Sequence, residues 1–122
     1  MLSALLRPKH TYNLIRLGQD NDGGYLLEKE SARKTKHLVS FGLANDWSFE
    51  KEFKKFNPDA TIVCYDHTVN KRYWSAYLWH NIGKLIFLKI SFKKFIDQLK
   101  KYSDYKKFFS QKNIKHLERA LG

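Results

Sequence analysis

The chain has 122 residues, and its hydrophobic content of 43% and aromatic content of 16% exclude a disordered composition and suit one domain with its own core. Its formal net charge is +11, no apolar run approaches the ~18 residues of a membrane span, and no signal-peptide pattern is present. The single cysteine, Cys64, cannot form an internal disulfide, so a reducing compartment and a cytoplasmic location are expected.

Residues 1–36 are predicted to form an N-terminal hairpin and a linker. Two extended pieces, Asn13–Leu17 and Tyr25–Leu27, flank a cluster of Gly, Asp and Asn residues, which is typical of a strand-loop-strand unit. The polar stretch Glu28–Lys36 is expected to be a short helix or a linker.

Residues 37–70 are predicted to form a cofactor-binding strand-helix-strand unit. His37–Phe41 and Thr61–Tyr65 are short apolar runs, as buried strands require. Between them, Phe49, Phe53 and Phe56 recur at helical spacing, and Asp46 or Ser48 can cap the helix that they predict. The turn Asn57-Pro58-Asp59 ends this helix. A right-handed crossover makes the two strands parallel.

Residues 71–122 are predicted to form a basic helical segment. They contain 13 Lys and Arg but only 3 Asp and Glu, so almost the whole charge imbalance lies here. Leu85–Ile90 is a continuous apolar run that suits a strand or a helix. The helical stripes predict that lysines face outward and that five apolar side chains face inward: Trp74, Phe92, Phe95, Ile96 and Leu99. The expected fold class is α/β, an incomplete Rossmann-like parallel sheet.

Gly42 and Asp66 follow the two predicted strands and lie 24 positions apart, near the roughly 20 expected in nucleoside-binding sheets. A glycine lets backbone approach a ligand, and a carboxylate can accept two hydrogen bonds from a ribose diol. Both also fit an ordinary turn glycine and an ordinary loop acid. We predict that the two residues lie close together, at the carboxyl ends of adjacent parallel strands.

The turn suits S-adenosylmethionine better than a dinucleotide. A dinucleotide turn reads G-x-G-x-x-G, but here Ala44 and Trp47 occupy the second and third glycine positions. Three acids also lie near the helix start, where they would repel a pyrophosphate and attract a sulfonium or an ammonium: Asp46, Glu50 and Glu52. Glu50 falls in the first helical turn, so its main expected role is to stabilise the helix dipole.

Four short motifs in order resemble the FkbM-like class I S-adenosylmethionine-dependent methyltransferases: Asn21–Tyr25 (NDGGY), Ser40–Gly42 (SFG), Asn45–Glu50 (NDWSFE) and Tyr65–Thr68 (YDHT). The resemblance implies O-methylation of a sugar or related small-molecule hydroxyl. It also implies a methionine contact at Gly42 and a ribose contact at Asp66. The predicted cofactor-binding residues are Asp22, Gly23, Gly24, Gly42, Leu43, Asp66 and His67.

Such methyltransferases have seven strands and about twice this length. We therefore expect a chain that shows two sheet strands and stops before a third, as an N-terminal fragment, a truncated gene product or one piece of a deliberately split protein. Such a chain would bind cofactor weakly and leave an apolar face exposed, through which it could self-associate.

Other chemistry has weaker support in the sequence. His67 fits a proton acceptor or a bystander, and no catalytic residue is assigned. Cys64 fits a core position, and the histidines show no metal-ligand spacing. The alternative function is a basic module that binds nucleic acid or an anionic surface, since lysines alternate with aromatics over Lys100–Lys115. The helical spacing of those aromatics favours a solvated lysine face over a nucleic-acid interface.

Overall fold

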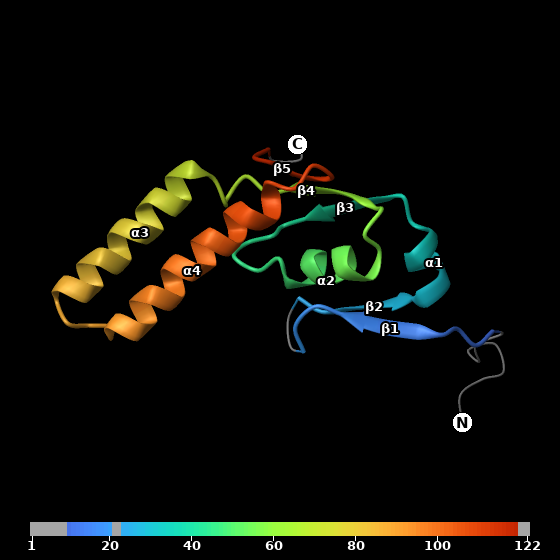
Figure 1. The fold of residues 1–122 in the computed structure, drawn as a ribbon, viewed down its shortest axis with the longest axis horizontal. Helices are drawn as coiled ribbons and strands as arrows, with labels where there is room; N and C mark the ends of the chain where they lie inside the picture. Colours follow the sequence, from blue (N-terminus) through green and yellow to red (C-terminus); the bar gives the residue numbers. More distant parts are fainter. Residues whose placement is uncertain (1–9, 21–22, 120–122) are drawn as a thin grey trace, which may run out of the picture.

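The computed structural model describes residues 10–20 and 23–119. The elements are β1 (Leu14–Leu17), β2 (Tyr25–Glu28), α1 (Lys29–Lys34), β3 (His37–Phe41), α2 (Ser48–Phe56), β4 (Thr61–Tyr65), α3 (Lys71–Ile86), α4 (Phe92–Phe109) and β5 (Ile114–Leu117). In the described part of the chain they form a two-stranded sheet, β1-β2, and a three-stranded sheet, β3-β4-β5. The fold is mixed α/β, with a parallel sheet flanked by helices (Figure 1).

The three-stranded sheet is parallel throughout, as predicted for β3 and β4. His37 pairs with Thr61 at the start of one ladder, and Ile62 pairs with Ile114 in the other. Side chains alternate between the faces of a strand, so Ile62 and Cys64 point the same way, and both are fully buried in the core. This arrangement is compatible with part of a Rossmann-like sheet.

Strand β5 shows that the two-strand expectation was wrong and that residues 71–122 are not wholly helical. The strand has four residues and joins the edge of β4. The Ile62 N–H donates to the Asn113 carbonyl at 2.9 Å, and the Asp66 N–H donates to the Leu117 carbonyl at 3.1 Å. A segment with the sequence Ile-Lys-His-Leu is too short and too polar for its pattern to predict a strand. Pairing with β4 therefore determines the conformation of this segment.

The N-terminal hairpin packs on α2, so that α2 lies between the two sheets (Figure 1). Strands β1 and β2 are antiparallel, as predicted. The Gly18 N–H donates to Glu52 Oε2 at 2.8 Å, and the Tyr25 ring meets the Phe49 ring edge-on with centroids 4.9 Å apart. These contacts hold the hairpin beside the start of α2, where the candidate site lies.

Helices α3 and α4 form an antiparallel helical hairpin that projects beyond the sheet (Figure 1). An aromatic cluster joins its base to α2: the buried Trp74 contacts the rings of Trp47 and Tyr105. Asp104 reinforces the junction because its carboxylate accepts from Trp47 Nε1 at 2.9 Å and from Lys51 Nζ at 2.7 Å.

The predicted inward stripe is correct only in part. Trp74 is buried and Phe95 and Ile96 are half-buried, but Phe92 is 67% exposed and Leu99 is 37% exposed. The spacing of the stripe predicted an apolar helix face, but it could not show which positions on that face another described element covers.

Asn57 ends α2 and also caps α1. Its Nδ2 donates to the Ala32 carbonyl at 2.9 Å and to the Thr35 carbonyl at 2.8 Å, and the residue is buried. These carbonyls are among the groups that a helix end leaves without an intrahelical partner. The Asn57 side chain therefore caps the end of α1 and helps to orient the next strand, β3.

We predict that Asn57→Ala lowers the free energy of unfolding by about 2 kcal/mol, because buried carbonyls lose their donors. Asn113→Ala is the matched control, since Asn113 is exposed, and it should change stability by less than about 0.5 kcal/mol. Urea denaturation measures both. Equal losses in the two variants would contradict the capping role.

Candidate functional site

The turn after β3 has an unusual backbone. Gly42 and Ala44 both have positive φ, at 70° and 47°, and the Gly42 N–H donates to the Tyr65 carbonyl at 3.0 Å. A Cβ added to Gly42 would meet no atom within 4 Å. The backbone conformation, rather than crowding, thus explains the glycine. The turn leaves open space that a ligand could occupy.

Asp66 ties this turn to the end of β4. Its Oδ2 accepts from the Ala44 N–H at 2.7 Å, and its Oδ1 accepts from the Thr68 N–H at 2.6 Å. Gly42 and Asp66 therefore lie together at the carboxyl ends of adjacent parallel strands, as predicted. The residue is only 4% exposed, so in this conformation its carboxylate primarily organises backbone.

His116 supports the same point from β5. Its Nε2 lies 3.0 Å from the Asp66 carbonyl, and its Nδ1 is hydrogen-bonded to the Tyr105 hydroxyl. A donor is needed opposite the carbonyl, so Nε2 carries the proton and Nδ1 accepts from Tyr105. Burial raises the pKa of Tyr105 to about 12, so the tyrosine keeps its proton at neutral pH. The sequence pattern did not predict this chain of hydrogen bonds, which we call the His116 relay, because β5 itself was not predicted.

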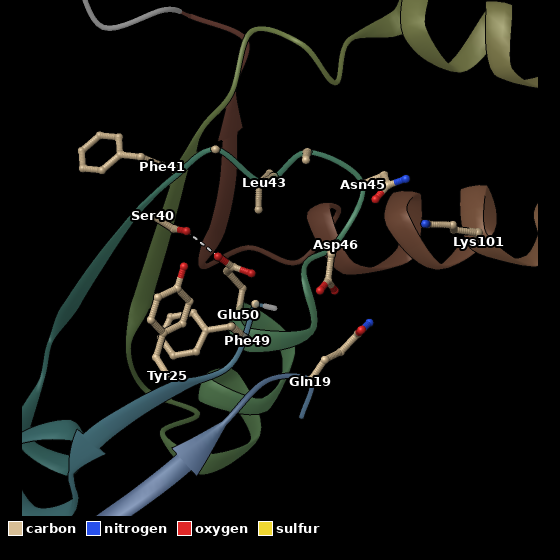
Figure 2. Close-up of a pocket in the computed structure, with 13 residues that line it drawn as sticks. Gln19, Tyr25, Ser40, Phe41, Leu43, Asn45, Asp46, Phe49, Glu50 and Lys101 are labelled. Carbon is tan, nitrogen blue, oxygen red and sulfur yellow. Dashed lines mark hydrogen bonds between the residues drawn. The ribbon is translucent and has the colours of Figure 1, made fainter. Parts of the chain in front are cut away.

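A first cleft of about 500 Å³ lies on the α2 side of the turn. Figure 2 shows Glu50 extending from the first turn of α2 toward the end of β3, where Ser40 Oγ donates to Glu50 Oε1. Asp46 lines the same cleft from the loop before α2, and Lys101 lines it from α4. The Gln19 and Tyr25 side chains complete the wall from the N-terminal hairpin (Figure 2).

Glu50 is a buried acid with an altered proton affinity. Only 4% of the residue is exposed, and burial raises the pKa of its carboxyl despite the opposing hydrogen bond from Ser40. Its place in the first turn of α2 fits the expected stabilisation of the helix dipole. Its burial in a cleft wall was not predictable from the Asn45–Glu50 motif.

Gly23 lies close to Asp46 at the rim of this cleft. A Cβ at Gly23 would approach Asp46 Oδ2 to 2.7 Å, and the residue has a φ of 94°. The glycine thus lets the hairpin loop meet the start of α2. Gly24 packs differently, because a Cβ there would collide with the Gln19 carbonyl and the Arg16 side chain within the hairpin.

A second cleft of about 410 Å³ lies on the other side of the turn. Gly42 and Ala44 line both clefts, so the turn is the wall between them. Phe41 and Tyr65 stack with ring centroids 5.7 Å apart and give this cleft an apolar side. Asp66, Thr68 and the exposed His67 line its polar side, together with Arg119.

The predicted cofactor residues therefore do not all form one wall. Gly23, Gly42, Asp66 and His67 line the clefts, whereas Leu43 does so from a side chain that is only 3% exposed and belongs to the core. Gly24 lines neither cleft. Asp22 lies outside the described residues. Gln19 and Lys101 were missed, because nothing local in the sequence places them beside the turn. Ser40 belongs to the Ser40–Gly42 motif but was not predicted as a site residue, because its bond to Glu50 is visible only in the structure.

Two other observations concern the residue types that bind metals or act as thiol nucleophiles. Within residues 10–20 and 23–119, no group of three His, Cys, Asp or Glu side chains is placed to hold a metal ion. Cys64 is fully buried, and burial raises the pKa of its thiol, so it behaves as a core side chain, as expected.

We predict that Asp66→Asn lowers the free energy of unfolding by about 2 kcal/mol at pH 7. Burial opposes ionisation of Asp66, but hydrogen bonds from Thr68, Ala44 and Val69 outweigh it and lower the pKa. A lowered pKa stabilises the fold above the unfolded value, near pH 4, and this stabilisation is lost as pH falls through the folded value. Urea denaturation at pH 7 and at pH 3 should show the difference shrinking with acid, and a pH-independent difference would contradict the assignment.

We predict that Glu50→Gln raises the free energy of unfolding at high pH, whereas Asp66→Asn lowers it. A raised pKa means that the folded state loses stability as pH rises from about 4.5 through the folded pKa. The amide keeps the acceptor for Ser40, so the variant should gain on the order of 1 kcal/mol at pH 8 and little at pH 4. Glu30→Gln, at an exposed position, is the control and should show no such trend. A Glu50→Gln variant that is less stable at pH 8 would contradict the burial account.

Comparison of the chain with protein-family models, with curated proteins and with solved structures gives no match. The resemblance to FkbM-like methyltransferases therefore rests on the four short motifs alone. Function is inferred from the residues and geometry of the two clefts.

Proposed function

We propose that this chain carries the cofactor-binding part of an S-adenosylmethionine-dependent methyltransferase. The observation that carries the proposal is the open Gly42–Ala44 turn between two clefts, at the carboxyl ends of β3 and β4. Ligands of open α/β sheets bind at such strand ends. A ligand that crosses the turn would place one part in each cleft.

The first cleft suits the methionine part of the cofactor. Glu50 and Asp46 supply acids toward the sulfonium and ammonium groups, whereas a pyrophosphate would meet repulsion. Lys101 lines the same cleft and can pair with the carboxylate of the ligand. A ligand that carries two positive charges would offset the destabilising burial of Glu50, which gives this acid a reason to occupy the cleft wall.

The second cleft suits the adenosine part. Phe41 and Tyr65 offer ring surface against which a base can pack. Asp66 Oδ2 accepts one hydrogen bond, from Ala44, and so keeps an acceptor position for a ribose hydroxyl. Asp66 thus shapes the turn and could also contact the ribose.

The acceptor is proposed from the family resemblance to be a hydroxyl of a sugar or a related small molecule. Methyl transfer requires the hydroxyl to be held in line with the sulfonium, and a base can assist by removing its proton. His67 is exposed at the rim of the second cleft, next to Asp66. No residue is assigned as the base.

We predict that Gly42→Ala weakens S-adenosylmethionine binding at least tenfold, because the added Cβ occupies the space above the turn and strains the backbone. Gly83→Ala is the matched control: Gly83 lies within α3, and its Cβ would also meet nothing within 4 Å. Isothermal titration calorimetry measures the affinity, and thermal melting verifies that both variants are folded.

Two results would count against the proposal. Equal affinity in the Gly42→Ala and Gly83→Ala variants would place the cofactor elsewhere. Binding of NAD or ATP in preference to S-adenosylmethionine would keep a nucleotide site at the turn but exclude the proposed cofactor.

A further inference from the structure

The tip of the α3–α4 hairpin exposes a group of apolar side chains that the cofactor clefts do not use. Ile86, Phe87 and Leu88 are consecutive and are 70%, 76% and 89% exposed, and Phe92 across the turn is 67% exposed. We call these four residues the apolar tip. They lie at the end of the projecting hairpin, away from both sheets (Figure 1). Such a group usually marks an interaction site.

The sequence on both sides of the apolar tip is basic, and the first acid after it is the exposed Asp97 in the second turn of α4. Residues 71–96 contain six Lys and Arg and no Asp or Glu. Four of the six flank the tip, namely Lys84, Lys89, Lys93 and Lys94. The apolar tip with its flanking lysines is complementary to an anionic lipid surface. The headgroups attract the lysines, and the acyl region accepts the apolar side chains.

The backbone at Leu88 is a second, independent indication. The Leu88 N–H donates to the Leu85 carbonyl at 3.0 Å, and the Lys89 N–H donates to the Lys84 carbonyl at 2.8 Å. This pair of bonds is a Schellman motif, in which the residue at the position of Leu88 is usually glycine. Leu88 has a φ of 53°, a strained value for a branched side chain. The chain thus places an exposed leucine where glycine would favour both folding and solubility, as is expected of a functional position.

We propose that the apolar tip and its lysines dock this protein on an anionic membrane surface, independently of the cofactor site. Ile86, Phe87 and Leu88 enter the interface first. Trp79 is 71% exposed and lies on α3 about 10 Å from Ile86, on the side away from the tip. This places it at the level of the headgroup region, which tryptophan prefers. No described helix is long and apolar enough to cross a membrane, so the contact is peripheral.

A membrane fits the tip better than nucleic acid or a second copy does. Phosphate contacts would use the lysines but give no reason for exposed Ile86 and Leu88, which cannot stack on bases. Two copies that met tip to tip would bring together two surfaces with four lysines each. Only a lipid surface uses both the aliphatic side chains and the charge.

The test is co-sedimentation of the full chain with phosphatidylcholine vesicles and with vesicles of equal parts phosphatidylcholine and phosphatidylserine. We expect binding to the anionic vesicles only. Leu88→Gly and Phe87→Ser should each lower that affinity about tenfold, while Leu88→Gly leaves the melting temperature unchanged or raises it. Leu26→Ser removes a leucine that is 63% exposed on β2 and should leave vesicle binding unchanged.

Insertion is measured separately with Phe87→Trp in a Trp79→Phe background, where the two remaining tryptophans, Trp47 and Trp74, are buried. The new tryptophan should shift its emission to the blue with anionic vesicles but not with a single-stranded oligonucleotide.

Three results would overturn the proposal. Unchanged vesicle affinity in both Leu88→Gly and Phe87→Ser would mean that the lysines bind any polyanion. Tighter binding of the oligonucleotide than of the vesicles would assign the surface to nucleic acid. A lipid-free dimer by light scattering that Leu88→Gly dissociates would assign the tip to a second copy.

Discussion

One carboxylate, that of Asp66, holds the candidate site together. It joins the turn after β3 to the loop after β4 through the N–H groups of Ala44 and Thr68. The backbone of the same residue pairs with Leu117 and accepts from His116, so Asp66 contacts the ends of all three parallel strands. Two residues of positive φ in the turn require such external support. These bonds hold the turn in the conformation that leaves open space above Gly42.

Charge is unevenly distributed between the clefts and the C-terminal segment. Glu50 and Asp46 line the first cleft together with Lys101, and Asp66 lines the second together with Arg119, whereas almost the whole charge imbalance of the chain lies in residues 71–122. Each region also contains a costly feature, the buried Glu50 in one and the left-handed Leu88 in the other. Natural sequences tolerate such departures where function requires them. The proposed cofactor site and the proposed docking surface therefore use separate parts of one small fold.

Local sequence patterns predicted the two strands whose carboxyl ends form the candidate site. The runs His37–Phe41 and Thr61–Tyr65, with Gly42 and Asp66 after them, indicated parallel strands and a shared edge, because strand and turn signals are encoded within a few residues. Strand β5, the Ser40–Glu50 bond and the His116 relay depend on contacts between distant segments, so no local pattern predicted them. The helical stripe that contains Phe92 and Leu99 shows the limit clearly: spacing identifies a face, and only the tertiary fold determines whether that face is covered.

A ligand that crosses the Gly42–Ala44 turn, with one part in each cleft, is the central element of the proposed function. The most direct measurement is a titration of the ¹⁵N-labelled chain with S-adenosylmethionine, followed through its backbone amide resonances. We predict that the amides of Gly42, Ala44, Asp46 and His67 shift together with one dissociation constant, while those of Ile86–Leu88 do not move. Shifts confined to the helical hairpin, or none at a large excess of cofactor, would contradict this proposal.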